Sequence, residues 1–170
     1  MRSTKGHAEP DVTREDVAEA AAAVANFQNY VQHAEGKVNV LVVVHAGAVA
    51  TVASQAGAGG LAEAGPVVAG VGLGLLGLFV LGVLISGYHL LRAIRPELRS
   101  PDRPSRYGIT GVRQVTGGTP ADRVAEAWSL ARLLAGIAQR KHAHVARAIP
   151  WTGLALVSAV LWTTLNAAPI

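Results

Sequence analysis

Three long stretches without any aspartate, glutamate, lysine or arginine constrain the fold more than any other feature. They cover residues 38–62, 64–91 and 148–170. Each is long enough to cross a hydrocarbon core of roughly 30 Å, which takes about 20 helical residues. The alternative is a set of three buried helices in a soluble protein. The rest of the sequence holds too little amphipathic helix to cover them, so we expect an integral membrane protein.

The expected fold is an all-α membrane protein with three transmembrane helices, the first and third of which are extended by cytoplasmic helices. Glycine is frequent after residue 54, which predicts a turn there, and several prolines and glycines after residue 92 predict an irregular, arginine-rich loop. The predicted parts are a cytoplasmic N-terminal helix (1–37), transmembrane helix 1 (38–56), an external turn (57–65), transmembrane helix 2 (66–91), a cytoplasmic loop (92–118), a cytoplasmic helix (119–149) and transmembrane helix 3 (150–168).

The positions of the basic residues predict the orientation of these spans. Of the 15 lysines and arginines, four precede residue 38 and eleven lie in 92–147. None lies between the first and second spans. Because cytoplasmic loops carry the excess of basic residues, we expect a cytoplasmic N-terminus and an external C-terminus.

Both cytoplasmic helices show an apolar stripe that continues toward a span. Either Asp11 or Thr13 is a suitable cap for the first helix, and Asp16 gives an approximate capping box with Thr13. Thr119 with Pro120 and Asp122 is a suitable start for the second. Pro150 marks either a kink or a first helical residue. The apolar positions recur at helical spacing and are Val17, Ala20, Val24, Phe27, Val31, Ala34, Val38 and Leu41 in the first helix, and Val124, Ala127, Leu130, Ala131, Leu134, Ile137 and Ala138 in the second.

No arrangement of residues in the sequence indicates catalysis. The chain has no cysteine, which excludes disulfides, thiolate metal sites and cysteine nucleophiles. His142 and His144 are two positions apart, unlike the four-residue spacing of a metal-binding pair on a helix. We therefore expect no enzyme, no cofactor and no metal. The basic residues gather beside the spans, so the net charge of +4 does not indicate a nucleic-acid polymer as partner.

Polar residues gather where the first and third spans meet their cytoplasmic helices. One interpretation is contact with lipid headgroups and an ion pair of Glu35 with a lysine or arginine that only stabilises packing. The other is a pocket for a small anion that is bound by arginine and stacked on Tyr30 or Tyr107. Gly70, Gly74 and Gly77 give the spacing that permits close helix association in lipid, so we also expect a homo-oligomer.

Three short segments are similar to a known family. They are Ala34-Glu35-Gly36-Lys37-Val38, Arg106-Tyr107-Gly108-Ile109, and the run from Leu130 to Lys141 (LARLLAGIAQRK). The chain resembles the small transmembrane effectors of Pycsar, the bacterial anti-phage systems that signal with cyclic pyrimidine nucleotides. Two positions depart from the family pattern, since Glu35 stands where aspartate is more frequent and Gly36 replaces a residue that favours helix more strongly.

This resemblance implies a sensor of cyclic CMP or cyclic UMP on the cytoplasmic side. Binding would damage the inner membrane and cause abortive infection, so the lipid bilayer is the second expected partner. A cyclic nucleotide is an anion with a planar base, for which basic and aromatic side chains are suitable ligands. The expected ligand-binding residues are Tyr30, Glu35, Lys37, Arg106, Tyr107 and Lys141.

Two other functions fit the same sequence. One is a membrane scaffold whose arginine-rich cytoplasmic surface docks a protein or anionic lipid without any nucleotide. The other is a small channel-like protein opened by other signals, although the spans contain few polar residues to line a path.

Overall fold

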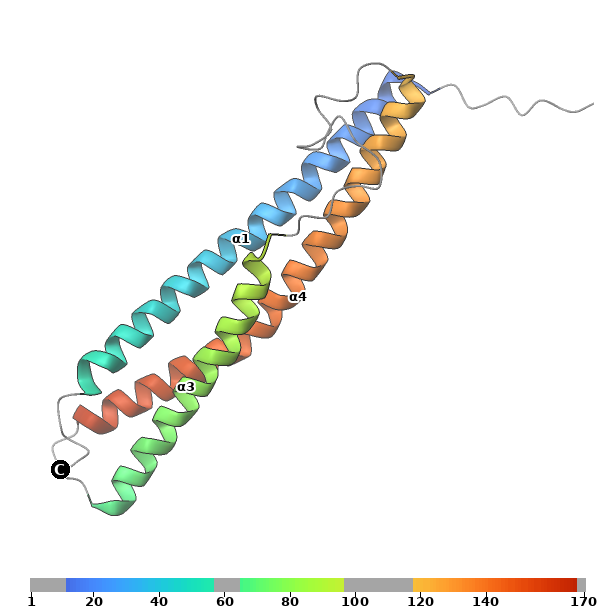
Figure 1. Cartoon of the computed structure of the whole chain (residues 1–170). Coiled ribbons are helices and arrows are strands. Elements are labelled where there is room, and N and C mark those ends of the chain that lie inside the picture. Colours follow the sequence, from blue (N-terminus) through green and yellow to red (C-terminus); the bar gives the residue numbers. More distant parts are fainter. Residues whose placement is uncertain (1–11, 57–64, 97–117, 168–170) are drawn as a thin grey trace, which may run out of the picture. The chain divides into compact units, whose positions relative to one another are not determined.

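The structure is a computed structural model that describes residues 12–56, 65–96 and 118–167, and its described part consists of long helices (Figure 1). These are α1 (Arg14–Ala56), α3 (Pro66–Ile94) and α4 (Pro120–Ala167). By length and composition, each contains a stretch suited to crossing a membrane. Within the described residues, the predicted all-α fold with three apolar helices is therefore confirmed. The exact membrane boundaries along α1 and α4 remain predictions.

Two capping boxes of the same geometry begin α1 and α4. The Asp16 carboxylate accepts hydrogen bonds of 2.8 Å from the backbone N–H and the hydroxyl of Thr13, and the backbone N–H of Asp16 donates to the Thr13 hydroxyl at 3.2 Å. Thr119 and Asp122 repeat these contacts at α4. The backbone and hydroxyl of Thr13 also hold the pKa of Asp16 below its ordinary value. The predicted starts at Thr13 and Thr119 are confirmed, and the alternative cap Asp11 lies outside the described residues.

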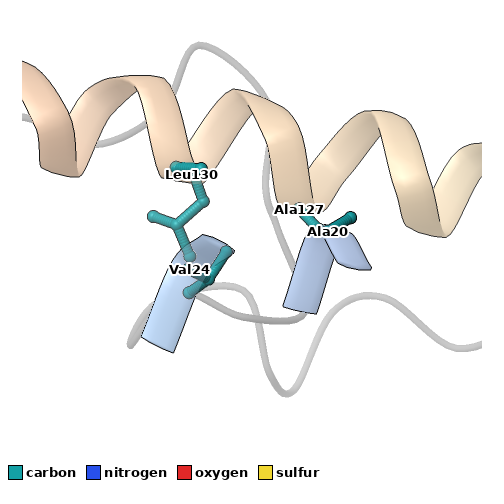
Figure 2. Packing of buried hydrophobic residues seen from close by; sticks show 5 residues of the cluster. Ala20, Val24, Ala127 and Leu130 are labelled. Carbon is teal, nitrogen blue, oxygen red and sulfur yellow. The ribbon is translucent and has the colours of Figure 1, made fainter. Parts of the chain in front are cut away.

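The described residues belong to two compact units, and α1 and α4 contribute to both. The first unit comprises Met1–Tyr30 and Leu98–Gly136. Its core, which we call the Val24 cluster, lies where the apolar stripes of the two helices meet, as Figure 2 shows for four of its residues. The stripe positions there are buried or half-buried, as predicted. The Val24 cluster consists of Ala20, Val24, Ala127, Leu130 and Ala131.

The second unit comprises Val31–Glu97 and Ile137–Ile170, and α1, α3 and α4 all contribute to its two apolar clusters. Alanine is frequent in both, so the helices approach closely and many larger apolar side chains stay on the exposed surface. Such a surface is typical of helices that face lipid. The Val38 cluster consists of Val38, Leu90, Ala93, Val145 and Ala148, and the Trp162 cluster of Val52, Phe79, Ala155, Ala159 and Trp162.

The helices α3 and α4 approach each other closely at Gly82. A Cβ atom there would lie 2.9 Å from the carbonyl oxygen of Trp151 and 3.0 Å from the Cβ of Ala155, so only glycine fits without displacing the helix. Gly70, Gly74 and Gly77, in contrast, have nothing within 4 Å of such an atom. Of these four glycines, Gly82 is therefore the one that packs closely against α4, and association between chains through the other three remains a prediction.

A buried polar contact lies one turn from Gly82. The Ser86 hydroxyl donates to the carbonyl oxygen of Ala148 at 3.2 Å and is 2.8 Å from the hydroxyl of Thr152. Pro150 lies inside α4 and has no N–H for the carbonyl oxygen four residues earlier, which weakens the helix at this level. The hydrogen bonds of Ser86 thus join α3 to the part of α4 whose own ladder is interrupted.

Candidate functional site

An ion pair between Glu35 of α1 and Lys141 of α4 lies in the second unit. The Lys141 ammonium is 2.6 Å from Oε1 of Glu35. The lysine side chain is only 9% exposed, whereas the glutamate side chain is 52% exposed. The ammonium group is therefore largely buried, whereas the carboxylate that pairs with it is accessible to solvent. The contact identifies which basic residue pairs with Glu35, a question that the sequence leaves open.

The helical stripes explain why Lys141 is buried. It follows Ala138 by three positions and precedes Val145 by four, so it lies on the same buried face of α4. On α1, Glu35 directly follows the buried Ala34 and lies at the edge of the corresponding face. The aliphatic stem of the lysine lies among apolar residues, and its ammonium reaches the carboxylate at their border.

Replacing Glu35 by alanine is expected to lower the free energy of unfolding by about 1–3 kcal/mol. The change leaves the Lys141 ammonium without this carboxylate in a largely buried position, but the solvent beside Glu35 keeps the cost below the 3–5 kcal/mol typical of a fully buried pair. Adding Lys141→Met should recover most of the loss, because no buried charge then remains. Thermal unfolding of the detergent-solubilised protein measures both effects. Equal stability of Glu35→Ala and the natural protein would contradict this role.

Lys37 lies apart from this ion pair. It is two positions after Glu35, which places it about 200° around the helix, and it is exposed. It lines a groove of about 470 Å³ between α1 and α4 in the second unit. The groove is bordered by Gln32, His33, Gly36, Lys37, Val40 and Leu41 of α1 and by Val145 and Ile149 of α4. The structure thus separates Lys37 from Glu35 and Lys141, two other residues of the predicted ligand-binding set.

The remaining predicted ligand-binding residues are Tyr30, Arg106 and Tyr107. Tyr30 belongs to the first unit, where it is 55% exposed and its ring centroid lies 6.2 Å from that of Phe27. Arg106 and Tyr107 lie outside the described residues. The role of all six residues in ligand binding remains a prediction.

Two histidines form a contact between α3 and α4 that the sequence does not predict. Nδ1 of His89 and Nδ1 of His144 are 3.4 Å apart, so a hydrogen bond here needs one nitrogen to carry a proton and the other to accept it. Burial lowers the pKa of His144, and the nearby positive groups His89, Arg147 and Arg92 lower it further. The folded protein therefore favours a neutral His144 in this contact.

Acidification is expected to destabilise the folded protein through His144. Its folded-state pKa lies below its ordinary value of 6.5, so the unfolded chain binds more protons as the pH falls below about 6.5. The contribution of His144 to the free energy of unfolding is thus greatest above this pH and declines as the pH falls toward the folded-state pKa. Below the folded-state pKa it declines no further. Thermal unfolding at pH 7.5, 6.5 and 5.5 should show the decline. His144→Gln should reduce it, and the exposed His33→Gln should not; equal slopes for both variants would contradict the role of His144.

Comparison with known proteins gives one clear relationship. The model of the Pycsar effector protein domain matches residues 19–168. This range contains all of α3 and α4 and most of α1. No curated protein matches the chain, and no solved structure does. With three helices suited to crossing a membrane and a family match over most of its length, the chain belongs to the Pycsar effector family and is an anti-phage membrane effector.

Proposed function

We propose that the protein binds cyclic CMP or cyclic UMP at the cytoplasmic face of the bacterial inner membrane and then impairs the integrity of that membrane. The outcome for the cell is abortive infection. Family membership supports this function, as does the excess of basic over acidic residues in the part of α4 that precedes its charge-free stretch. The proposal assigns the chain no catalytic step and no cofactor.

The Glu35–Lys141 ion pair is the observation that carries the proposal. A cyclic nucleotide has a phosphate with one negative charge, which competes with a carboxylate for the same ammonium group. Glu35 is half exposed, so it is the partner that yields its position to an incoming anion. Once the phosphate holds Lys141, α1 and α4 lose the direct contact between Glu35 and Lys141 in the second unit.

This exchange acts on the membrane because the same two helices contain candidate spans. Glu35 lies three residues before the charge-free part of α1, and Lys141 lies seven residues before that of α4. Both α1 and α4 remain helical over these residues. A ligand that binds one arrangement of these helices more tightly than the other shifts the equilibrium between the two arrangements. The difference in affinity sets the size of the shift, and the packing of the spans changes with it.

Association between chains then turns a local change into membrane damage. Gly70, Gly74 and Gly77 of α3 have open space where a side chain would be, and Leu73, Val80 and Leu84 nearby are exposed. Such a surface is suited to close packing against a second copy in lipid. In the proposed orientation, the N-terminus is cytoplasmic and the C-terminus is external.

Calorimetry of the full-length, detergent-solubilised protein tests the sensing step. Cyclic CMP, cyclic UMP, cyclic AMP and cyclic GMP are titrated separately under the same conditions. The expected result is binding of a pyrimidine nucleotide and much weaker binding of both purine nucleotides. Absence of binding by all four, with the protein folded by circular dichroism, would rule the proposal out.

A further inference from the structure

The groove between α1 and α4 changes from polar to apolar along its length. Gln32, His33 and Lys37 border one part, and residues later in α1 border the other. The apolar part is strongly exposed, with Val40 64% and Ile149 56% accessible to solvent. The groove therefore offers a place for a polar group and, beside it, a surface for a hydrocarbon chain.

The groove changes from polar to apolar at the level of the Val38 cluster, where the charge-free stretches meet the charged residues that border them. Lys37, Arg92 and Arg147 are the charged residues that border the charge-free stretches on the side of this cluster. Each is next to, or between, members of the cluster, in which the three helices pack together. The charge-free stretches of all three helices therefore each have one end at the same level of the second unit. A membrane that contains these stretches has its headgroup region at Lys37 and its acyl chains beside Val40 and Ile149.

Lys37 has no ion-pair partner in the described part of the chain, unlike Lys141. The neighbouring Gly36 adds no side chain to the groove and has nothing within 4 Å of the place where one would begin. An exposed ammonium at the headgroup level attracts an anionic lipid, and its long stem lets it reach a phosphate while its backbone remains beside the apolar surface.

We propose that this groove binds one anionic phospholipid, with the phosphate at Lys37 and an acyl chain along Val40, Leu41, Val145 and Ile149. The order of polar and apolar residues matches the order of headgroup and chain in such a lipid. A cyclic nucleotide has no hydrocarbon chain and would leave the apolar part of the groove without a partner. The inference is independent of the proposed function and gives Lys37 a ligand other than the nucleotide that the sequence predicts.

Native mass spectrometry of the full-length protein tests the inference. The protein is released from mixed micelles that contain equal amounts of phosphatidylglycerol and phosphatidylcholine, and the lipid that remains bound is counted. We expect phosphatidylglycerol to be retained several-fold more than phosphatidylcholine. Lys37→Gln should remove this preference, and Lys37→Arg should keep it. Arg14→Gln removes the same charge from the first unit and should leave the preference unchanged.

Two further arms address the apolar part and the other possible ligand. Val40→Phe, which narrows the groove without a change in charge, should lower the retention of both lipids. In Lys141→Met, which lacks the ammonium proposed to bind the nucleotide, saturating cyclic CMP should leave the retained phosphatidylglycerol unchanged. An unaltered preference in folded Lys37→Gln would overturn the inference. So would displacement of the lipid by cyclic CMP from Lys141→Met, which would instead assign the groove to the nucleotide.

Discussion

Gly82→Leu is expected to abolish protection against phage and to lower the free energy of unfolding by about 3 kcal/mol or more. A Cβ atom at this position would lie 2.9 Å from a backbone oxygen of α4, and the flanking Ala155 is buried and cannot move aside freely. Overpacked sites typically cost 1–3 kcal/mol, and here part of the obstacle is backbone. The four carbons of leucine must separate α3 from α4, which also breaks the hydrogen bonds of Ser86.

Gly77→Leu is the matched control for the loss of stability. It introduces the same side chain into the same helix at a position with nothing within 4 Å. Its stability should equal or slightly exceed that of the natural protein, because leucine favours helix by up to about 1 kcal/mol over glycine. Thermal unfolding in detergent compares the stability of the two variants, and phage plating measures the loss of protection caused by Gly82→Leu. Equal stability of both variants would show that α3 and α4 do not approach closely at Gly82.

Opposite effects on ligand affinity are expected from the two members of the Glu35–Lys141 pair. Lys141→Met should weaken binding of the cyclic pyrimidine by about 10- to 100-fold, since a hydrogen bond between charged groups contributes about 1.5–3 kcal/mol. Glu35→Gln removes the competing negative charge and should strengthen binding. The half-exposed Glu35 remains hydrated when Lys141 is replaced, so the fold of Lys141→Met should persist.

The opposite directions separate ligand binding from packing. If the pair only stabilised the packing of α1 against α4, both replacements would weaken the response to the ligand or leave it unchanged. Calorimetry with the nucleotide that binds the natural protein gives the affinities, and circular dichroism shows that each variant is folded. Weaker binding by both variants would contradict the exchange of Glu35 for a phosphate.

Local features of the sequence were sufficient to predict the helices. The stripes from Val17 to Leu41 and from Val124 to Ala138 depend only on spacing within one helix, and none of their positions is exposed in the structure. The capping boxes at Thr13 and Thr119 are likewise formed within four residues. Features that a single turn or stripe determines can be predicted without knowledge of the neighbouring helix.

Contacts between helices were predicted less completely, because they depend on the register of one helix against another and on the angle at which the helices cross. The sequence indicates a partner for Glu35 but not that it is Lys141, 106 positions later. Gly70, Gly74, Gly77 and Gly82 look alike in sequence, yet only Gly82 of these four meets α4. The His89–His144 contact and the place of Lys37 in the groove depend on the same packing, so neither was predicted.

Dye release from sealed liposomes tests the central claim most directly. The full-length protein is reconstituted, and cyclic CMP or cyclic UMP is added to the side that exposes the N-terminus, with cyclic AMP as the control. The account predicts rapid release with a cyclic pyrimidine, no release with cyclic AMP, and none from liposomes that contain Gly82→Leu. Unchanged dye retention after addition of a pyrimidine nucleotide that binds the protein would contradict it.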